Sequence, residues 1–145
     1  ATQSPCGNLA ADAGCENSTG MGARLTGSGS ASVGTDDLFL TVAPVPANQF
    51  GIVFMGGGQS QQLFGDGLRC IASGGIGIFR YSVQSTGSGS FTRGPIVGYS
   101  QANFPPAGRI QAGQTWYFQG WFRDPQGPCG NAFNLSQGAE VSFEL

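Results

Sequence analysis

The stretch "QTWYFQGWFR" at residues 114–123 decides the fold class, because two kinds of side chain alternate along it. If the stretch is a strand, one face is wholly apolar and carries Trp116, Phe118, Gly120 and Phe122. The opposite face combines aromatic rings with an amide and a guanidinium, on Tyr117, Gln119, Trp121 and Arg123. This period of two predicts a strand with one face in a core and the other half-exposed.

Short apolar runs elsewhere in the chain predict further strands. "DDLFLTVA" (36–43) and "AEVSFEL" (139–145) alternate in the same way, whereas "FGIVFM" (50–55) is apolar on both faces. We predict other strands from a second set of stretches, at residues 22–28, 63–72, 76–83, 94–101 and 109–113, and a Gly-Asp-Gly turn or bulge divides the stretch 63–72 into two short strands. The run "GGGQSQQ" (56–62) is predicted to be a loop.

No window of helical length carries apolar residues at a period of 3.6. The turns between the strands are rich in glycine, which accounts for 26 of the 145 residues. We therefore predict an all-β fold: a single-domain antiparallel β-sandwich, jelly-roll or immunoglobulin-like, that is stapled by disulfides. The sandwich is predicted over residues 21–145, after an irregular, disulfide-closed segment at residues 1–20.

Composition argues against several classes of function. Histidine and lysine are absent, and the six basic residues are scattered arginines in a chain of net charge −2. This pattern does not form the basic stripe of a nucleic-acid-binding protein, and no apolar run is long enough to span a bilayer. Without histidine or lysine, the chain also lacks the commonest general base and the residue for Schiff-base chemistry. We expect neither an enzyme nor a protein that inserts into membranes.

Carboxylates remain as candidates for chemistry. A pair of them is the usual machinery of glycosidases, and Asp66 and Asp124 would approach each other if Cys70 were bonded to Cys129. Both lie in turn motifs, so we predict structural roles for them. Calcium binding by Asp36, Asp37 and Asp66 is a weaker alternative, because their spacing matches no calcium loop. We predict no other cofactor or metal.

The four cysteines, Cys6, Cys15, Cys70 and Cys129, point to disulfides and an oxidising compartment. Of the three complete pairings, we favour Cys6–Cys15 with Cys70–Cys129, which combines a short local loop with one long-range link. No CxxC spacing supports a zinc site. The chain begins "ATQSPCG", and we expect this start on a small residue to follow the removal of a secretory signal. The predicted protein is secreted and extracellular.

Several stretches together resemble a known domain: "DDLFLTVAPVPANQFGIVFMG" (36–56), "GDGLRC" (65–70), "IFRYSV" (78–83), "TWYFQGWFRDP" (115–125) and "GNAFNLSQGAEVSF" (130–143). The domain resembled is a β-rich domain of secreted and surface proteins of planctomycetes, myxobacteria and related bacteria, and the resemblance covers roughly residues 20–145. It implies an extracellular β-domain at the cell surface and supplies no catalytic residues. Because the domain stands nearly alone in this chain, the resemblance favours self-assembly.

The first functional hypothesis is a structural protein that assembles with copies of itself into a filament or surface layer. Edge-strand pairing between subunits would use the C-terminal strand, with Val141, Phe143 and Leu145. The alternative is a carbohydrate-binding or adhesion module that uses Tyr117, Gln119, Trp121 and Arg123. Packing inside the domain, contact with a second copy and glycan binding are all open readings of that face.

Overall fold

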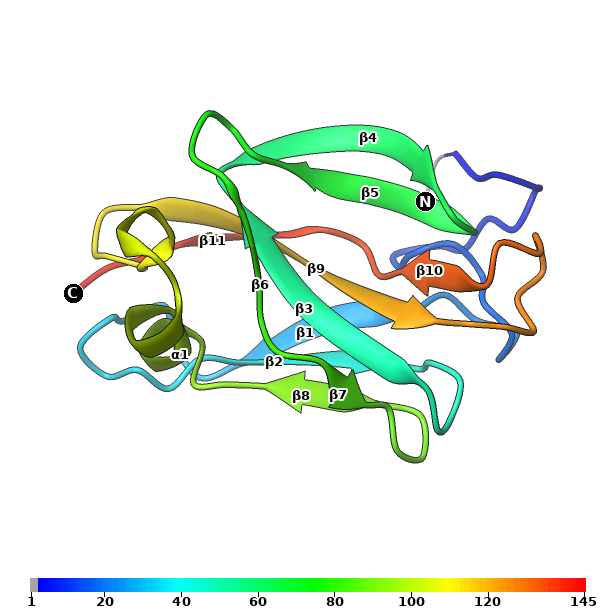
Figure 1. Ribbon diagram of the computed structural model, residues 1–145, viewed down its shortest axis with the longest axis horizontal. Coiled ribbons are helices and arrows are strands. Elements are labelled where there is room, and N and C mark those ends of the chain that lie inside the picture. The colour runs from blue at the N-terminus through cyan, green and yellow to red at the C-terminus, as the bar shows by residue number, and fades with distance from the viewer. Residues whose placement is uncertain (1–2) are drawn as a thin grey trace.

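The computed structural model describes residues 3–145 and contains three antiparallel sheets (Figure 1). The three-stranded sheet has the order β1 (Arg24–Ser28), β2 (Phe39–Ala43) and β8 (Phe91–Arg93). The six-stranded sheet has the order β10 (Phe133–Leu135), β9 (Thr115–Arg123), β3 (Phe50–Gly56) and β6 (Ile78–Arg80). Two further strands join it, β11 (Ala139–Ser142) on β9 and β7 (Gln84–Ser85) on β3. The third sheet is a hairpin of β4 (Gly58–Phe64) and β5 (Gly67–Ala72).

The main core lies between the three-stranded and six-stranded sheets, so the predicted antiparallel β-sandwich is confirmed. The apolar face of β9 enters this core as predicted, and Trp116, Phe118 and Phe122 are each exposed by 1% or less. Burial of side chains of this size stabilises the fold by about 1.5–3 kcal/mol each. Gly120 lets the two sheets approach closely, since a Cβ there would lie 2.5 Å from Val42 Cγ2.

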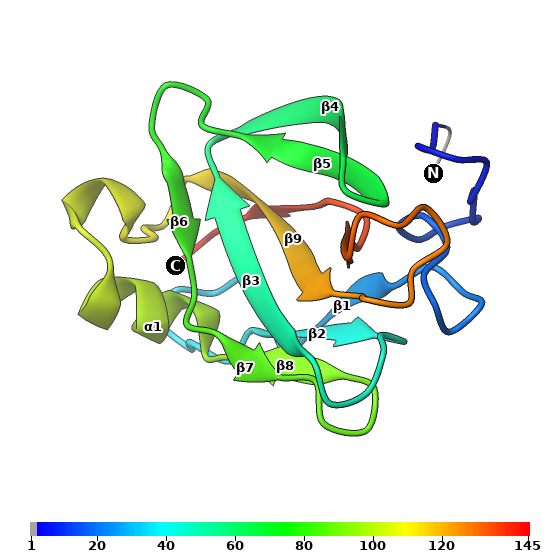
Figure 2. The ribbon, with the colours of Figure 1, turned by 45° about the vertical axis from the view of Figure 1, so that its right-hand side comes forward.

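The β4–β5 hairpin forms a third layer on the outer face of the six-stranded sheet, away from the main core (Figure 2). The turn at its tip contains Gly65 with φ +58°, in the left-handed region that glycine tolerates best. A second, smaller core joins the hairpin to the sheet and contains Phe54, Ile71 and Leu135. The hairpin is therefore packed onto the domain rather than extended into solvent.

Three predictions of local structure are wrong. Residues 94–101, predicted as a strand, instead contain most of the helix α1 (Ile96–Asn103), which precedes a short 3₁₀ turn (Pro106–Gly108). The helix is too short for a 3.6-residue period to be visible, and its buried residues are Ile96, Val97 and Ser100. Asp36 stabilises its first turn, because the Gly98 N–H donates to Asp36 Oδ1 at 2.9 Å. No helix within residues 3–145 is long and apolar enough to cross a membrane.

The predicted loop at 56–62 is also wrong, since β4 begins at Gly58. The polar residues of β4 misled the prediction because the strand lies at the surface and most of its side chains are exposed. Residues 109–113, predicted as an edge strand, form no strand. Of the irregular segment predicted at 1–20, residues 3–20 contain turns and one half of an isolated Glu16–Gly22 bridge, while residues 1 and 2 lie outside the described residues.

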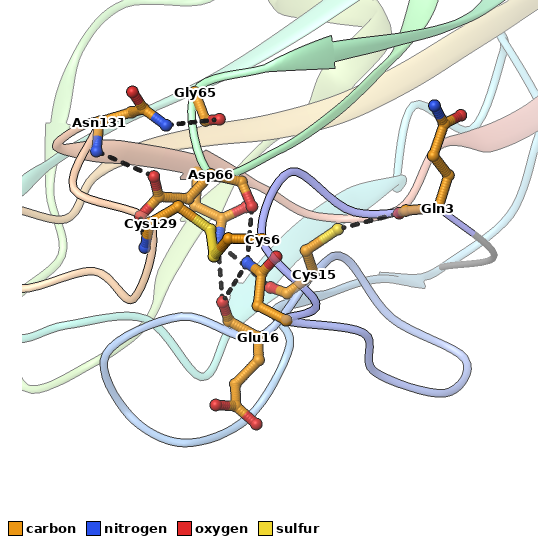
Figure 3. Close-up of a disulfide and its surroundings, with 10 residues drawn as sticks. Gln3, Cys6, Cys15, Glu16, Gly65, Asp66, Cys129 and Asn131 are labelled. Carbon is orange, nitrogen blue, oxygen red and sulfur yellow. Dashed lines mark hydrogen bonds between the residues drawn. A yellow bond between two sulfur atoms is a disulfide. The ribbon is translucent and has the colours of Figure 1, made fainter.

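The predicted disulfide pairing is wrong in both bonds. Cys6 is bonded to Cys129, with their Cα atoms 5.7 Å apart (Figure 3). Cys15 and Cys70 are free thiols. Hydrogen bonds between distant segments explain this pairing. Asn8 Nδ2 donates to the Asp66 carbonyl at 2.8 Å, and Asp66 Oδ1 accepts the Asn131 N–H at 3.0 Å, so that Cys6 lies beside the loop of Cys129.

Candidate functional site

A groove of about 310 Å³ lies between the β4–β5 hairpin and the outer face of the six-stranded sheet. Its floor is apolar and consists of Ile52, Phe54, Ile78 and Trp121. Three longer side chains complete the lining, namely Phe64, Arg69 and Arg80. We call this site the hairpin groove. Among the described residues that line it, two are cationic and none carries a carboxylate.

The strand register places the floor residues on one face. Trp121 of β9 is directly opposite Ile52 of β3, and Phe54 of β3 is directly opposite Arg80 of β6. Residues that are directly opposite in a sheet project to the same side. The alternation that buries the inner face of β9 therefore brings Trp121 and Arg80 to the same outer surface.

Trp121 is half-buried and belongs to a row of aromatic rings. Its ring centroid lies 5.7 Å from that of Phe133, and the Phe133 ring lies 4.9 Å from that of Phe64 on the hairpin. These contacts hold the indole in place, while the rest of its surface faces the groove. A fixed, partly accessible indole is suited to stacking against a flat apolar surface of a ligand.

The two arginines of the groove have few partners. Arg69 Nη2 donates to Gln62 Oε1 at 3.0 Å and its Cζ lies 6.0 Å from the Phe64 ring centroid, but its buried Nε has no hydrogen-bond partner. The exposed Arg80 guanidinium forms no hydrogen bond or ion pair with any residue in the range 3–145. A free guanidinium beside an apolar surface binds carboxylates well, because its N–H fork matches their two oxygens.

The four residues predicted as a ligand face do share one side of β9, but the structure separates them. Gln119 is 0% exposed: its Oε1 accepts the Cys70 N–H, and its Nε2 donates to the carbonyls of Leu68 and Ser136. Contrary to the prediction, it has no surface left for a ligand. Trp121 lines the hairpin groove, whereas Tyr117 lines a separate hollow on the other side of Gln119. Arg123 is exposed and does not line the groove.

Sequence reasoning missed Phe64, Arg69 and Arg80 as site residues. A signal for Arg80 exists in "IFRYSV", where the arginine alternates with Phe79 and Tyr81, both of which pack in the main core. No comparable signal exists for Arg69, because its position depends on how the hairpin folds over the sheet.

The C-terminal strand, predicted to pair with another subunit, is paired within its own chain. In β11, Val141 is opposite Trp116 of β9 and packs partly buried against the main core. Phe143 is buried in that core, and its N–H donates to the Gln114 carbonyl at 2.8 Å. Leu145 is 94% exposed. Strand exchange stays a prediction, and it would require β11 to leave β9.

Asp66 and Asp124 approach each other even without a Cys70–Cys129 bond. Both are 0% exposed, and a Cβ built on Gly127 would lie 2.2 Å from Asp66 Oδ2 and 3.0 Å from Asp124 Oδ2. Each carboxylate is used in holding a loop: Asp66 accepts backbone N–H groups of residues 129 and 131, and Asp124 Oδ2 accepts the Ser18 N–H at 2.9 Å. These contacts support the predicted structural roles.

The three aspartates of the calcium alternative serve separate loops. Asp36 caps the first turn of α1, and Asp37 Oδ1 accepts hydrogen bonds from the Ser30 hydroxyl at 2.7 Å and the Ser30 N–H at 3.0 Å. The Ser30 hydroxyl lowers the pKa of Asp37 below its ordinary value. Within residues 3–145 no group of three or more His, Cys, Asp or Glu side chains is arranged to hold a metal ion.

Comparisons of the chain with protein-family models, curated proteins and solved structures find no match. The resemblance to bacterial surface domains therefore stays a prediction.

Proposed function

We propose that this protein is a secreted binding module that holds an acidic polysaccharide in the hairpin groove. The ligand class is a glycan with carboxylate groups, such as a chain of uronic acids. This role develops the carbohydrate-binding alternative of the sequence and keeps Trp121, but Phe64, Arg69 and Arg80 take the place of Tyr117, Gln119 and Arg123. It assigns no reaction to the chain.

The observation that carries this proposal is the pair of weakly partnered arginines above an apolar floor. The buried Nε of Arg69 lacks a hydrogen-bond partner, and leaving a buried donor unpaired costs about 1–3 kcal/mol. Because this atom is shielded from solvent, a ligand carboxylate would reach it only after the Arg69 side chain turns toward the groove, and the new hydrogen bond would then remove that cost. Arg80 extends from the neighbouring side of the groove and would bind a second acidic unit or the same one.

The aromatic residues support a sugar rather than a small inorganic anion. Trp121 presents part of its indole to the groove, and Phe64 is 40% exposed at its edge. The apolar faces of pyranose rings stack on such side chains, while their carboxylates turn toward cationic groups. A free phosphate or sulfate ion would use the arginines but gain nothing from the floor.

The proposal of secretion is supported by the Cys6–Cys129 disulfide, because such bonds persist in oxidising compartments. The bond closes a separation of 123 residues, and the chain-entropy model gives it at most about 5 kcal/mol of stabilisation. A module of this kind would stay folded outside the cell, where acidic polysaccharides occur.

Titration calorimetry with a defined oligogalacturonate, beside a neutral cello-oligosaccharide of the same length, tests the proposal. We expect the acidic oligomer to bind and the neutral one to bind at least tenfold more weakly. Added salt should weaken the acidic interaction, because charge pairs at a half-exposed site are screened. Arg80→Gln keeps much of the side-chain length but removes the charge, and should weaken binding about tenfold, the equivalent of one charged hydrogen bond.

Arg123→Gln is the matched control, since Arg123 lies on β9 but outside the groove. It should leave the affinity unchanged. Equal binding of the acidic and neutral oligomers would refute the role of the arginines. An absence of binding to either oligomer at millimolar concentration would refute the glycan proposal as a whole.

A further inference from the structure

Cys15 and Cys70 line the same cavity, which has a volume of about 440 Å³. Cys15 belongs to the irregular segment before β1, and Cys70 is on β5 of the hairpin. The Cys6–Cys129 bond leaves these two cysteines as the free thiols of the chain. Of the three complete pairings of four cysteines, one alone is compatible with Cys6–Cys129, and it joins Cys15 to Cys70.

We propose that Cys15 and Cys70 form a second disulfide, which ties the N-terminal segment to the hairpin. The bond would fix the hairpin next to Arg69, which precedes Cys70 in β5. This inference is independent of any ligand, and it applies whether or not the hairpin groove binds a glycan.

Both cysteines lie against the same short run of chain, residues 134–138. Asn134 Nδ2 donates to the Cys15 carbonyl at 3.2 Å, and a Cβ on Gly14 would lie 2.0 Å from the Leu135 carbonyl oxygen. At the other end of the run, a Cβ on Gly138 would lie 3.0 Å from the Cys70 Cβ. The run therefore contacts both cysteines, Cys15 at one end and Cys70 at the other, and the cavity that both line lies between these contacts.

Neither thiol is held by a strong interaction. Cys15 Sγ donates to the Gln3 carbonyl at 3.5 Å, which Figure 3 shows as a dashed line, and Cys70 Sγ donates to the Leu68 carbonyl at 3.8 Å. Such long contacts to sulfur cost little to break. The cavity offers space on the side that both residues line.

Electrostatics is consistent with this proximity. Burial raises the pKa of both thiols, and the charge of a Cys70 thiolate raises the pKa of Cys15 further. Free thiols in such a place are mostly protonated at neutral pH, so bond formation is expected to accelerate as the pH rises.

A small disulfide such as oxidised glutathione is the oxidant of the two cysteine thiols. The thiolate of Cys70, the more accessible of the two, attacks this disulfide, forms a mixed disulfide and releases one glutathione thiolate. The Cys15 thiolate then attacks Cys70 Sγ and releases the second glutathione. Two electrons pass to the small disulfide, and the two protons of the protein thiols end on the two glutathione molecules.

Digestion with a protease that cleaves before aspartate tests the pairing directly. Cleavage before Asp12, Asp66 and Asp124 places Cys6, Cys15, Cys70 and Cys129 on four different peptides. The full chain is oxidised with excess glutathione disulfide, unfolded, alkylated with a maleimide without reductant, and digested. We expect no alkylated cysteine, one linked pair containing Cys15 and Cys70, and another containing Cys6 and Cys129.

Single variants provide the control. Cys15→Ser and Cys70→Ser should each leave one unpaired cysteine, recovered either alkylated or as a mixed disulfide with glutathione, whereas the double variant should leave none and keep the Cys6–Cys129 pair. If Cys15 and Cys70 of the oxidised wild-type chain are recovered unpaired, either alkylated or carrying glutathione, the proposal is overturned. A linked pair that joins Cys15 or Cys70 to any other cysteine would also overturn it.

Discussion

Gln119 of β9 holds Cys70 of β5 in place: the Cys70 N–H donates to Gln119 Oε1 at 2.9 Å. The Gln119 Nε2 group donates to the Leu68 carbonyl at 2.8 Å and to the Ser136 carbonyl at 2.7 Å. One buried amide therefore joins the hairpin, the six-stranded sheet and the chain after β10. The hairpin groove lies on one side of this link, with Trp121, and a separate hollow lies on the other, with Tyr117.

Replacement of this amide should destabilise the domain strongly. Gln119→Leu has a similar size but leaves one buried N–H and two carbonyls without their partner. We expect the free energy of unfolding to fall by about 3 kcal/mol, since each unpaired buried group costs roughly 1–3 kcal/mol and some will relax. Urea denaturation measures the change. Gln126→Leu, at an exposed glutamine, should change the stability by less than about 0.5 kcal/mol. Equal effects of the two variants would contradict the bridging role.

The two tryptophans should differ in their access to a soluble quencher. Trp116 is 1% exposed and its Nε1 donates to Gln114 Oε1 at 3.0 Å, whereas Trp121 is half-buried at the groove. Acrylamide should therefore quench one fraction of the fluorescence and spare the other. In Trp121→Phe the quenchable fraction should be lost, because the remaining indole is shielded. Strong quenching of this variant would show that Trp121 is not the accessible ring.

The C-terminal strand offers a matched pair of substitutions. Phe143 is 3% exposed in the main core and Leu145 is 94% exposed, although they are two residues apart. Phe143→Ala should lower the free energy of unfolding by about 3–5 kcal/mol, and Leu145→Ala by less than about 0.5 kcal/mol. Urea denaturation at two protein concentrations distinguishes β11 paired with β9 of its own chain from β11 exchanged between subunits. A stability that rises with protein concentration would contradict pairing within one chain and support strand exchange.

Alkaline pH should destabilise the domain through Tyr81. This residue is 1% exposed, its hydroxyl donates to the Ile96 carbonyl at 3.0 Å, and burial raises its pKa well above the ordinary value. Because the unfolded chain releases this proton at a lower pH, the contribution of Tyr81 to the free energy of unfolding should be constant below about pH 10 and fall above it.

Tyr81→Phe is the control for this titration. It should lose about 1 kcal/mol at neutral pH, from the missing hydrogen bond, and show a shallower decline above about pH 10. Denaturation curves between neutral pH and pH 11 compare the two slopes. Identical slopes in wild type and variant would mean that Tyr81 does not govern the alkaline decline.

The predictions from sequence succeeded where neighbours along the chain decide the structure. The alternation of residues 114–123 determines which side chains of β9 face the core, because a strand turns successive residues to opposite sides. The same reasoning places Val141 and Phe143 toward the main core and leaves Glu140 and Glu144 at the surface. Glycine and proline between these runs mark the turns, since they adopt backbone angles that other residues avoid.

Contacts between distant segments decided the rest. Cys6 pairs with Cys129 because Asn8 and Asp66 bring their loops together, although a bond to Cys15 would close a much shorter loop. Residues 96–103 form a helix because Asp36 and the main core hold Gly98 and Ile96. Arg69 joins Arg80 and Trp121 only when the hairpin packs on Phe54 and Leu135. By itself the sequence determined the strands with a clear apolar pattern, such as β2, β3 and β9, and their buried faces, through local periodicity. Tertiary packing alone decided the disulfide and the groove, because their residues meet only once the sheets are assembled.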